Sequence, residues 1–277
     1  MSVDRYAVIG NPVAHSKSPL IQTAFAQATG QSLVYELLPA PRDGFVATVE
    51  RFVREGGNGL NVTIPFKLEA YALARERSAR ASAAGACNTL AWRGDHWYGD
   101  NTDGAGLLRD LVHNVGATVA GRDVLVLGAG GAARGIVLPL LQEAPRRLVI
   151  ANRTLSRATG LASAFAASGP VTAVAPASLA GQRFDIVINA TSIGLGSEVP
   201  RDLWPGGLFS PGALAYDLVY ANTTTPFVAW AIGQGATITA DGLGMLIEQA
   251  AESFALWRGV RPETAPVFAL MRDHRAW

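Results

Sequence analysis

The chain has 277 residues, enough for roughly two domains, and 49% of them are hydrophobic, which supplies ample core. Its formal net charge of +1 gives no electrostatic case for nucleic acid or an anionic membrane as a partner. The single cysteine, Cys87, excludes an internal disulfide and fits a reducing compartment. Because we find neither a membrane-length apolar run nor the apolar segment of a secretory signal, we expect a soluble, cytoplasmic protein.

Strands and helices alternate through the first part of the chain. Strands are predicted at 6–9, 33–38 and 59–64, and helices at 19–29 and 45–55. Ser18 can cap the first helix, with Pro19 at its first position. Two further strands, at 88–92 and 96–98, flank a predicted hairpin turn at Arg93-Gly94-Asp95. This alternation predicts an α/β domain with a mainly parallel sheet.

A second run of alternating elements follows a helix that should extend from Asn101 to about Val115. Strands are predicted at 124–127, 148–151, 171–174, 185–189, 213–217 and 236–239, with helices between them. A last long helix, at 243–257, suggests that the chain returns to the first domain. We therefore expect domains at 1–103 and 104–240, C-terminal helices at 241–277, and a ligand cleft between the two domains.

The stretch Asp123–Gly135, DVLVLGAGGAARG, joins a short apolar strand to a glycine turn and the start of a helix. Gly128, Gly130 and Ala133 fit the dinucleotide-binding pattern G-x-G-x-x-G/A. The first glycine allows a tight turn, the second lets the backbone approach a pyrophosphate, and the alanine lets the helix pack closely. The helix N-terminus then presents free N–H groups to the phosphates. A purely structural strand-to-helix turn is the alternative interpretation.

The end of the next strand predicts which dinucleotide binds. A carboxylate there accepts the ribose 2′-OH of NAD and repels a 2′-phosphate, but residues 151–157 contain none. Arg153 and Arg157 stand there instead, and a guanidinium pairs with phosphate oxygens through a fixed fork of donors. We therefore predict NADP(H), against the alternative of two solvated arginines at a helix start.

A polar segment, Asn189–Gly194, follows another apolar strand in the second domain. Short polar residues at the carboxyl end of a strand lie where a cofactor crosses the sheet edge. An ordinary loop explains the segment equally well.

Polar residues suited to a small polyhydroxylated acid are spread over the first domain. They provide hydroxyls, amides, one amine and one carboxylate: Ser16, Ser18, Asn61, Thr63, Lys67, Asn88 and Asp103. Asn61 and Thr63 are expected on the same face of one strand. A lysine near a carboxylate can relay a proton to an alkoxide when it is partly desolvated. Spacing alone nevertheless favours turn and cap roles for the amides and the carboxylate, with Lys67 on the surface.

Nine segments, in order, resemble the shikimate dehydrogenase family over essentially the whole chain. They are GNPVAHSKSP (Gly10–Pro19), GLNVTIPFK (Gly59–Lys67), GACNTL (Gly85–Leu90), GDNTDG (Gly99–Gly104), GAGGAAR (Gly128–Arg134), NRT (Asn152–Thr154), NATSIG (Asn189–Gly194), YDLVY (Tyr216–Tyr220) with TPF (Thr225–Phe227), and DGLGMLIEQAAESF (Asp241–Phe254). The resemblance implies the reversible, NADPH-dependent reduction of 3-dehydroshikimate to shikimate, a step toward chorismate and the aromatic amino acids.

The resemblance also implies an N-terminal substrate domain, a Rossmann-type NADP-binding domain, and C-terminal helices packed on the substrate domain. Lys67 and Asp103 match the catalytic pair of the family. The implied substrate ligands are Ser16, Ser18, Asn61, Thr63, Lys67, Asn88, Asp103, Tyr220 and Gln249. The implied cofactor contacts are Gly128, Ala129, Gly130, Gly131, Ala132, Asn152, Arg153, Thr154, Arg157, Thr191, Leu218 and Gly242. No metal is implied, and a monomer or a homodimer is expected.

Three departures from the family pattern leave the catalytic pair intact. Cys87 replaces a frequent valine, Leu218 replaces a common methionine, and residues 221–225 lack a lysine often found there. Other functions remain open: a related enzyme acting on quinate or aminoshikimate, or an NADP(H)-binding sensor without turnover. Arg153 argues against the NAD use that often accompanies quinate oxidation, and the presence of Lys67 and Asp103 argues against the sensor. A structural protein would explain none of the polar residues.

Overall fold

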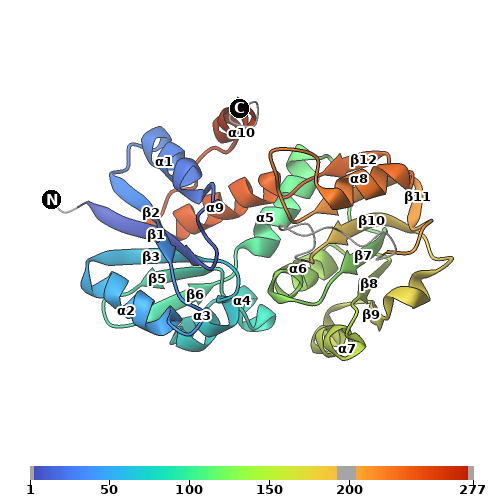
Figure 1. The fold of residues 1–277 in the computed structure, drawn as a ribbon, viewed down its shortest axis with the longest axis horizontal. Coiled ribbons are helices and arrows are strands. Elements are labelled where there is room, and N and C mark those ends of the chain that lie inside the picture. Colours follow the sequence, from blue (N-terminus) through green and yellow to red (C-terminus); the bar gives the residue numbers. More distant parts are fainter. Residues whose placement is uncertain (1–2, 192–203, 274–277) are drawn as a thin grey trace. The chain divides into compact units, whose positions relative to one another are not determined.

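The structure is a computed structural model that describes residues 3–191 and 204–273. Within these residues the chain divides into two compact units (Figure 1). Unit 1 comprises the residues up to Gly106 and those from Leu246 onward, and unit 2 comprises Leu107 to Met245. Both units are α/β, which confirms the predicted fold class.

Unit 1 is built on a six-stranded sheet. Its strands are β1 (Asp4–Gly10), β2 (Leu33–Pro39), β3 (Gly57–Val62), β4 (Glu76–Arg77), β5 (Thr89–Trp92) and β6 (Trp97–Asp100), in the order β2-β1-β3-β5-β6-β4. The helices of this part of the chain are α1 (Ser18–Ala28), α2 (Phe45–Arg54), α3 (Lys67–Leu73), α4 (Ala79–Ala84), the start of α5 (Asp103–Arg109), most of α9 (Leu243–Arg258) and α10 (Ala265–Asp273). Strand β5 is antiparallel to β3 and β6, and the other pairings are parallel, so the sheet is mainly parallel as expected.

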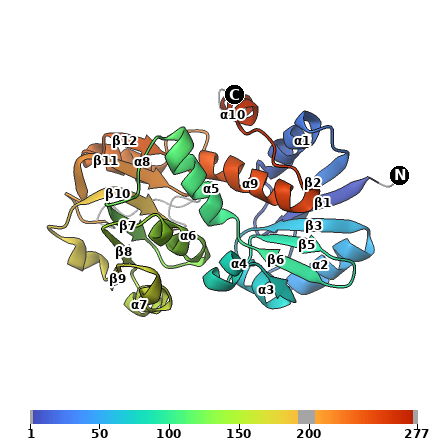
Figure 2. The ribbon, with the colours of Figure 1, turned by 180° about the vertical axis from the view of Figure 1, so that it is seen from behind.

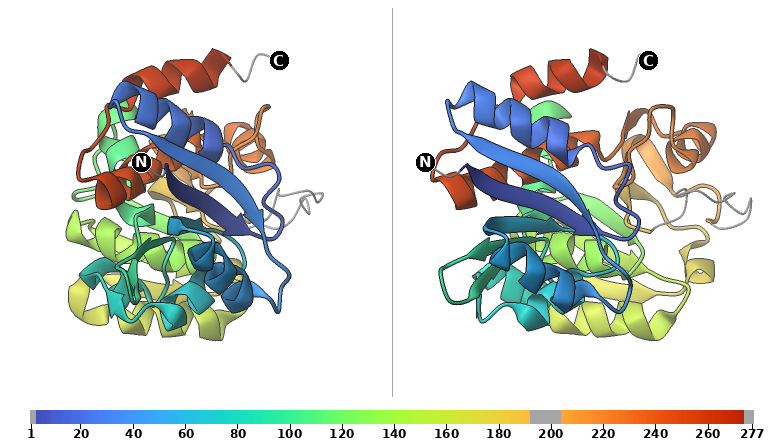
Figure 3. Two further views of the ribbon diagram at one scale, coloured as in Figure 1. Left: turned by 90° about the vertical axis from the view of Figure 1, so that its left-hand side faces the viewer. Right: turned by 60° about the vertical axis from the view of Figure 1, so that its left-hand side comes forward.

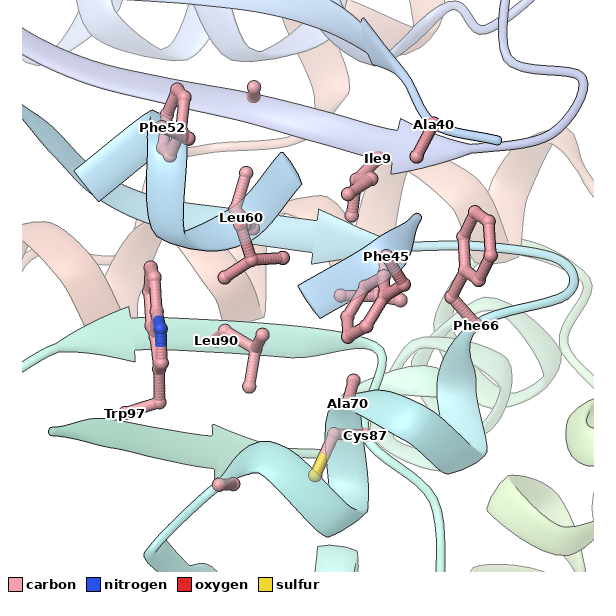
Figure 4. Close-up of a cluster of buried hydrophobic side chains, with 14 of the residues drawn as sticks. Ile9, Ala40, Phe45, Phe52, Leu60, Phe66, Ala70, Cys87, Leu90 and Trp97 are labelled. Atoms are coloured by element: carbon pink, nitrogen blue, oxygen red, sulfur yellow. The ribbon is translucent and has the colours of Figure 1, made fainter. Parts of the chain in front are cut away.

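The apolar core of unit 1 lies between the sheet and the helices α2 and α3. Phe45 of α2 stacks on Phe66, with ring centroids 5.1 Å apart, beside Ile9 and Leu60 (Figure 4). Cys87 belongs to the same cluster and is free and fully buried. Burial raises the pKa of its thiol to about 12.

A second, smaller cluster covers the opposite face of this sheet. Side chains alternate between the two faces of a strand, so Tyr6 and Val8 point away from the core cluster. Tyr6 stacks on Trp257 of α9 at a centroid distance of 4.7 Å. Helix α1 lies beside β2 and β1 on the views of Figure 3. The sheet of unit 1 is therefore covered by helices on both faces.

Unit 2 contains a six-stranded sheet in which every pairing is parallel. Its strands are β7 (Asp123–Leu127), β8 (Arg147–Ala151), β9 (Val171–Val174), β10 (Phe184–Asn189), β11 (Phe209–Asp217) and β12 (Ile238–Ala240), in the order β12-β11-β10-β7-β8-β9. Its helical elements are α6 (Gly131–Gln142), α7 (Leu155–Ala164), α8 (Pro226–Gly233), a π-helical turn η1 (Asp110–Asn114) and two 3-10 turns, η2 (Ala166–Ser168) and η3 (Pro176–Leu179). This is the order of a doubly wound nucleotide-binding sheet.

The strands of unit 2 read as apolar runs because both faces of their sheet are covered. Val124, Leu125, Val126 and Leu127 of β7 are all buried. Helix α8 contributes Phe227 to the core on one face, and Figure 2 shows α6 beside β7. None of the helices in the described part of the chain has the length and apolarity that a membrane span requires.

Two expectations about helix and strand ends in unit 1 are wrong. Ser18 does not cap α1: Lys17 is the N-cap residue, and Ser18 is the first helical residue, followed by Pro19. Strand β3 ends at Val62, so Thr63 is not on its face. The carbonyl of Thr63 instead accepts a hydrogen bond from the Phe66 N–H at 3.0 Å, which closes a turn into α3.

The helix expected to run to about Val115 changes character at Asp110. Helix α5 ends at Arg109, and the wider turn η1 follows, in which the Val115 N–H donates to the Asp110 carbonyl at 2.9 Å. The buried Asp110 carboxylate accepts from the Tyr216 hydroxyl at 2.6 Å. Burial raises the pKa of Tyr216 well above its ordinary value, so the phenol is a neutral donor.

The close fit of Gly244 against Asp110 predicts a large stability loss on adding a single methyl group. A Cβ at Gly244 would overlap the Asp110 carboxylate. We expect Gly244→Ala to lower the free energy of unfolding by about 2–3 kcal/mol. Gly160→Ala is the matched control, because Gly160 lies within α7 with no neighbour near its Cβ position; it should stabilise by about 0.5–1 kcal/mol. Equal effects in denaturant unfolding would contradict the proposed overlap.

Candidate active site

An ion pair between Lys67 and Asp103 lies at the centre of the polar residues of unit 1. Lys67 is the first residue of α3, Asp103 is the first residue of α5, and Lys67 Nζ lies 2.5 Å from Asp103 Oδ2. The two side chains are only 16% and 6% exposed. Lys67 is therefore not the surface lysine that its spacing favoured. Desolvation strengthens such a pair and makes removal of either partner costly.

The side chain of Asn88 contacts Asp103 of this pair, the preceding Thr102, and Gln249. Its Nδ2 donates to the second oxygen of Asp103, Oδ1, at 2.8 Å and to Thr102 Oγ1 at 2.9 Å. The same group lies 3.2 Å from Gln249 Oε1 of α9. Its Oδ1 accepts from the Thr102 N–H at 2.8 Å. Asn88 is buried and therefore fixes the side chain of Asp103 on the side away from Lys67.

The backbone of Asn88 and its neighbour brings these side chains together. The Asn88 N–H donates to the Asp100 carbonyl at 3.1 Å, and the Asn88 carbonyl accepts from the Val62 N–H at 2.7 Å. The Cys87 N–H donates to the Lys67 carbonyl at 2.9 Å, which ties the start of α3 to this segment. These bonds join the ends of β3 and β6 to the start of β5.

A second polar group in unit 1 contains Asn61, Ser16 and Ser18. Asn61 is buried at the end of β3 and accepts from the hydroxyl of Tyr35 at 2.7 Å. Ser16 Oγ lies 3.1 Å from Ser18 Oγ and accepts from the Ser18 N–H at 3.2 Å. The Ser18 hydroxyl opposes the rise that burial causes in the pKa of the Tyr35 phenol, so Ser18 lies close to the partner of Asn61.

The remaining two residues predicted to bind substrate are Thr63 and Tyr220. Thr63 is half-buried between β3 and α3, and its methyl group occupies the space where a Cβ on Gly10 would lie. Tyr220 follows β11 and belongs to unit 2. Ser16, Ser18, Asn61, Lys67, Asn88, Asp103 and Gln249 all belong to unit 1.

The glycine turn of unit 2 lies where its strand order reverses. Gly128 follows β7, and the strands on either side, β8 and β10, continue the sheet in opposite directions. Ligands of such sheets bind outside the carboxyl ends of the strands at this position. Gly128 has a φ of +107°, and a Cβ there would lie 3.0 Å from the Ala190 backbone, so only glycine fits without strain.

The start of α6 suits the phosphates of a dinucleotide. Gly130 is its N-cap residue, and no side chain of the described residues caps the first N–H groups. A Cβ at Gly130 would meet no neighbour, so the backbone is open to a close ligand. Ala133 is fully buried, as expected for close packing of the helix. Free N–H groups and the positive end of the helix dipole favour an anion here.

The residues after β8 provide cations and no carboxylate. Asn152 Nδ2 donates to the Thr154 carbonyl at 2.9 Å, which fixes the turn before α7. Thr154 is the N-cap residue, Arg153 precedes it, and Arg157 lies in the first turn of the helix. Both arginines are exposed. Their position at the carboxyl edge of the sheet fits a 2′-phosphate.

The last predicted cofactor residues lie at the ends of β10 and β11 and after β12. Thr191 donates through its hydroxyl to Asn189 Oδ1 at 2.7 Å, while Asn189 Nδ2 donates to Asp217 Oδ1 at 2.9 Å. A Cβ at Gly242 would overlap the Leu218 carbonyl, so these two residues are in close backbone contact. Within the predicted Asn189–Gly194 segment, the part after Thr191 lies outside the described residues.

Burial raises the pKa of the Asp217 carboxyl, and hydrogen bonds from Thr225, Val219 and Asn189 oppose that shift. Asp217 ends β11, and its Oδ1 also accepts from the Val219 N–H at 3.0 Å. The carboxylate therefore orders the start of the segment that carries Leu218 and Tyr220. No group of three or more His, Cys, Asp and Glu side chains suited to a metal ion occurs among the described residues.

These features define a class of protein. A parallel sheet with a glycine turn at its reversal point is suited to a dinucleotide, and a desolvated lysine–carboxylate pair in a separate α/β unit is suited to proton transfer. The fold and the site are those of a two-unit, dinucleotide-dependent oxidoreductase.

Family models match three parts of the chain. The shikimate dehydrogenase substrate binding domain matches residues 8–90, the shikimate/quinate 5-dehydrogenase model matches 110–195, and the shikimate 5′-dehydrogenase C-terminal domain matches 242–272. The chain belongs to the shikimate dehydrogenase family, which confirms the resemblance found in its motifs.

Curated relatives and solved structures extend over nearly the whole chain. The NADP(+) shikimate dehydrogenase of Aromatoleum aromaticum is 58% identical over 98% of both chains, and that of Herminiimonas arsenicoxydans is 59% identical over 97% of both. A crystal structure of an Ael1 enzyme from Pseudomonas putida has a TM-score of 0.88 at 48% identity, covering 96% of this chain and 97% of that one. Shikimate 5-dehydrogenase from Thermus thermophilus, in complex with NADP(H) and shikimate, has a TM-score of 0.83 at 32% identity, covering 98% and 99%.

Sequence reasoning did not single out four residues that contact the predicted site. Thr102, Thr89 and Ser253 lie within the GDNTDG, GACNTL and DGLGMLIEQAAESF segments, so their neighbourhoods carried a signal, whereas that of Tyr35 did not. Tyr35, Thr89 and Ser253 reach Asn61 from β2, β5 and α9, far apart in the chain. No spacing rule connects such positions, and only the folded sheet and helix bring them together.

The exposed arginine after β8 yields a test of cofactor selectivity. We expect Arg153→Asp to raise the KM for NADPH far more than the KM for NADH, because the new carboxylate repels a 2′-phosphate. Arg122→Asp is the matched control: Arg122 is also exposed but precedes β7, at the amino end of the sheet. Steady-state kinetics with both cofactors provide the measurement. Equal changes for NADPH and NADH would contradict a role for Arg153 in selectivity.

Proposed function

We propose that this chain catalyses the reversible, NADPH-dependent reduction of 3-dehydroshikimate to shikimate, a step of the shikimate pathway toward chorismate and the aromatic amino acids. The observation that carries the proposal is the desolvated Lys67–Asp103 pair in the unit that matches the substrate binding domain. Two kinds of similarity support it. The relatives are NADP(+) shikimate dehydrogenases, and a similar crystal structure is that of a shikimate 5-dehydrogenase in complex with NADP(H) and shikimate.

NADPH, when bound, supplies the hydride for the ketone. We assign its pyrophosphate to the glycine turn at Gly128–Ala132 and the N–H groups of α6, and its 2′-phosphate to the segment Asn152–Thr154 with Arg157. Thr191, Leu218 and Gly242, at the ends of neighbouring strands, are assigned to the nicotinamide side. The open backbone at Gly130 and the exposed guanidinium of Arg153 support this assignment.

Lys67 and Asp103 are proposed to handle the charge and the proton at the reacting oxygen. The C3 carbonyl oxygen gains negative charge as it is reduced, and the ammonium of Lys67 stabilises that charge. Lys67 and Asp103 together deliver the proton, and in the reverse direction they accept the proton of the hydroxyl.

The other polar residues of unit 1 are proposed to hold the substrate. Ser16 and Ser18 offer hydroxyl donors for its carboxylate, and Asn61, Thr63, Asn88 and Gln249 orient the ring hydroxyls. Tyr220 is assigned to the substrate from unit 2. Fixed geometry at the reacting carbon is a large part of what such a site contributes to the rate.

For the whole chain we propose the domain organisation that its sequence suggested. Residues 1–103 form the substrate domain, 104–240 the NADP domain, and 241–277 the helices that return to the substrate domain. The assignment of Gln249 to unit 1 supports the return. The proposed partner is a small-molecule substrate. All the assigned residues belong to one chain, so both a monomer and a homodimer fit the proposal. The free thiol of Cys87 supports a cytoplasmic location.

A spectrophotometric assay tests this function directly. We expect the purified chain to reduce NADP+ with shikimate, followed at 340 nm, far faster than NAD+ with shikimate or either cofactor with quinate. Turnover with quinate and NAD+ alone would identify the related quinate enzyme. No turnover with either acid would favour an NADP(H)-binding sensor.

Removing the amine of Lys67 should abolish most of the turnover. Lys67→Met keeps an unbranched side chain, one atom shorter, that neither stabilises an alkoxide nor donates a proton. We expect kcat to fall by about 10²–10⁴-fold, with a smaller change in the KM for shikimate. A kcat near that of the wild type would show that Lys67 is not catalytic.

Removing the charge of Asp103 separates catalysis from folding. Asp103→Asn keeps an oxygen that can accept from Asn88 but leaves the Lys67 ammonium without its counter-ion, so the thermal unfolding midpoint should fall while the chain stays folded at the assay temperature, and kcat is lost. Circular dichroism melting and the 340 nm assay provide the two measurements. A variant that loses its fold along with its activity would assign Asp103 to the structure of the α5 start.

A further inference from the structure

The carboxamide of Asn61 is held at both ends by groups that the substrate assignment does not include. Its Oδ1 accepts from the hydroxyl of Tyr35 at 2.7 Å. Its Nδ2 donates to Ser253 Oγ at 2.8 Å and to Thr89 Oγ1 at 3.2 Å. Both N–H groups are therefore committed to the protein. One lone pair of Oδ1 is left, so Asn61 can only accept a hydrogen bond from a ligand.

Tyr35 is a fixed, neutral donor. It lies on β2 with 7% of its surface exposed, and its ring lies 6.3 Å from the ring of Trp257. Burial raises the pKa of its phenol well above the ordinary value, and a hydrogen bond from Ser18 opposes the shift. Tyr35 therefore holds the Asn61 carboxamide through its hydroxyl group.

Ser253 connects the other end of Asn61 to the residues around Asn88. It is fully buried, one turn beyond Gln249 on α9, and its Oγ lies 3.1 Å from the Gln249 carbonyl. The same oxygen lies 2.8 Å from Thr89 Oγ1 and 3.3 Å from Thr102 Oγ1. Thr89 in turn donates to Asn88 Oδ1 at 3.0 Å. The chain of contacts runs without interruption from Tyr35 to Asn88.

We propose that Tyr35 and Ser253 are positioning residues that clamp the Asn61 carboxamide from opposite ends and thereby set its affinity for a ring hydroxyl of the substrate. This inference rests on the proposed function. The clamp fixes which end of the amide faces the ligand, because the N–H end is held by Ser253 and Thr89. A buried donor or acceptor left without its partner is costly, so loss of either clamp residue lets the amide rotate.

Two single variants test the clamp from its two ends. Tyr35→Phe removes only the hydroxyl and keeps the buried ring, and Ser253→Ala removes only the hydroxyl of Ser253. Each should raise the KM for shikimate by about tenfold, with a smaller change in kcat and an unchanged KM for NADP+. Thr29→Ala is the matched control: its hydroxyl donates to a helix carbonyl, that of Phe25 at 2.7 Å, away from Asn61. It should leave both constants unchanged.

A double-mutant cycle with Asn61→Ala separates positioning from general loosening of the unit. If both residues act through Asn61, each variant should change the KM by less than about twofold in the Asn61→Ala background. Full tenfold effects in that background would overturn the proposal, and so would single variants that match the wild type. Should Ser253→Ala fail to fold, Tyr35→Phe alone decides. A wild-type enzyme inert with shikimate would instead overturn the proposed function, and this inference with it.

Discussion

The polar site of unit 1 depends on one buried amide, that of Asn88. Its backbone joins the ends of β3 and β6, and its side chain reaches Asp103, Thr102 and Gln249 from a single position. An amide supplies two donors and two acceptor sites in a fixed plane, which no hydroxyl or charged group can reproduce. Without it, Asp103 would lose the contact that holds its carboxylate opposite Lys67.

The position of Asp103 also depends on the ion pair between Arg80 and Asp100. Arg80 of α4 donates from Nε and Nη2 to the two oxygens of Asp100, at 2.7 and 2.6 Å. Burial alone would raise the pKa of Asp100, but the hydrogen bonds and charge of Arg80, with help from Ser78, bring it below its ordinary value. Asp100 is thus ionised, and its carboxylate also accepts from the Asn101 N–H at 2.7 Å. The turn that presents Asp103 is anchored by this pair.

The sequence predicted most of the fold because its signals are local. Alternating strands and helices, the glycine turn at Gly128 and the absence of a carboxylate after β8 each depend on neighbouring residues. The structure departs from expectation where distant groups decide: the π-helical turn at Asp110 forms opposite Tyr216, and β3 ends where Thr63 closes a turn. The Lys67–Asp103 contact could be expected only from the family resemblance, since the sheet of unit 1 brings the two residues together.

The contacts that hold Asn61 likewise could not be predicted from local sequence signals. Thr89 and Ser253 lie within the GACNTL and DGLGMLIEQAAESF segments, but nothing in the sequence indicates that they and Tyr35 contact the same amide. Their role arises from burial, because a hydrogen-bonding group removed from water must find a partner inside the protein. The described part of unit 1 meets that requirement by passing hydrogen bonds from one side chain to the next.

The lone thiol in the core of unit 1 makes the opening of that unit measurable by itself. Cys87 is the only cysteine of the chain, it is fully buried, and its raised pKa keeps it protonated near neutral pH. An alkylating reagent can reach it only during transient exposure of the core, so the rate of labelling reports the free energy of that opening. Ligands that bind unit 1 should slow the labelling in proportion to their affinity. The chain therefore carries a native probe of substrate-domain dynamics and needs no introduced label.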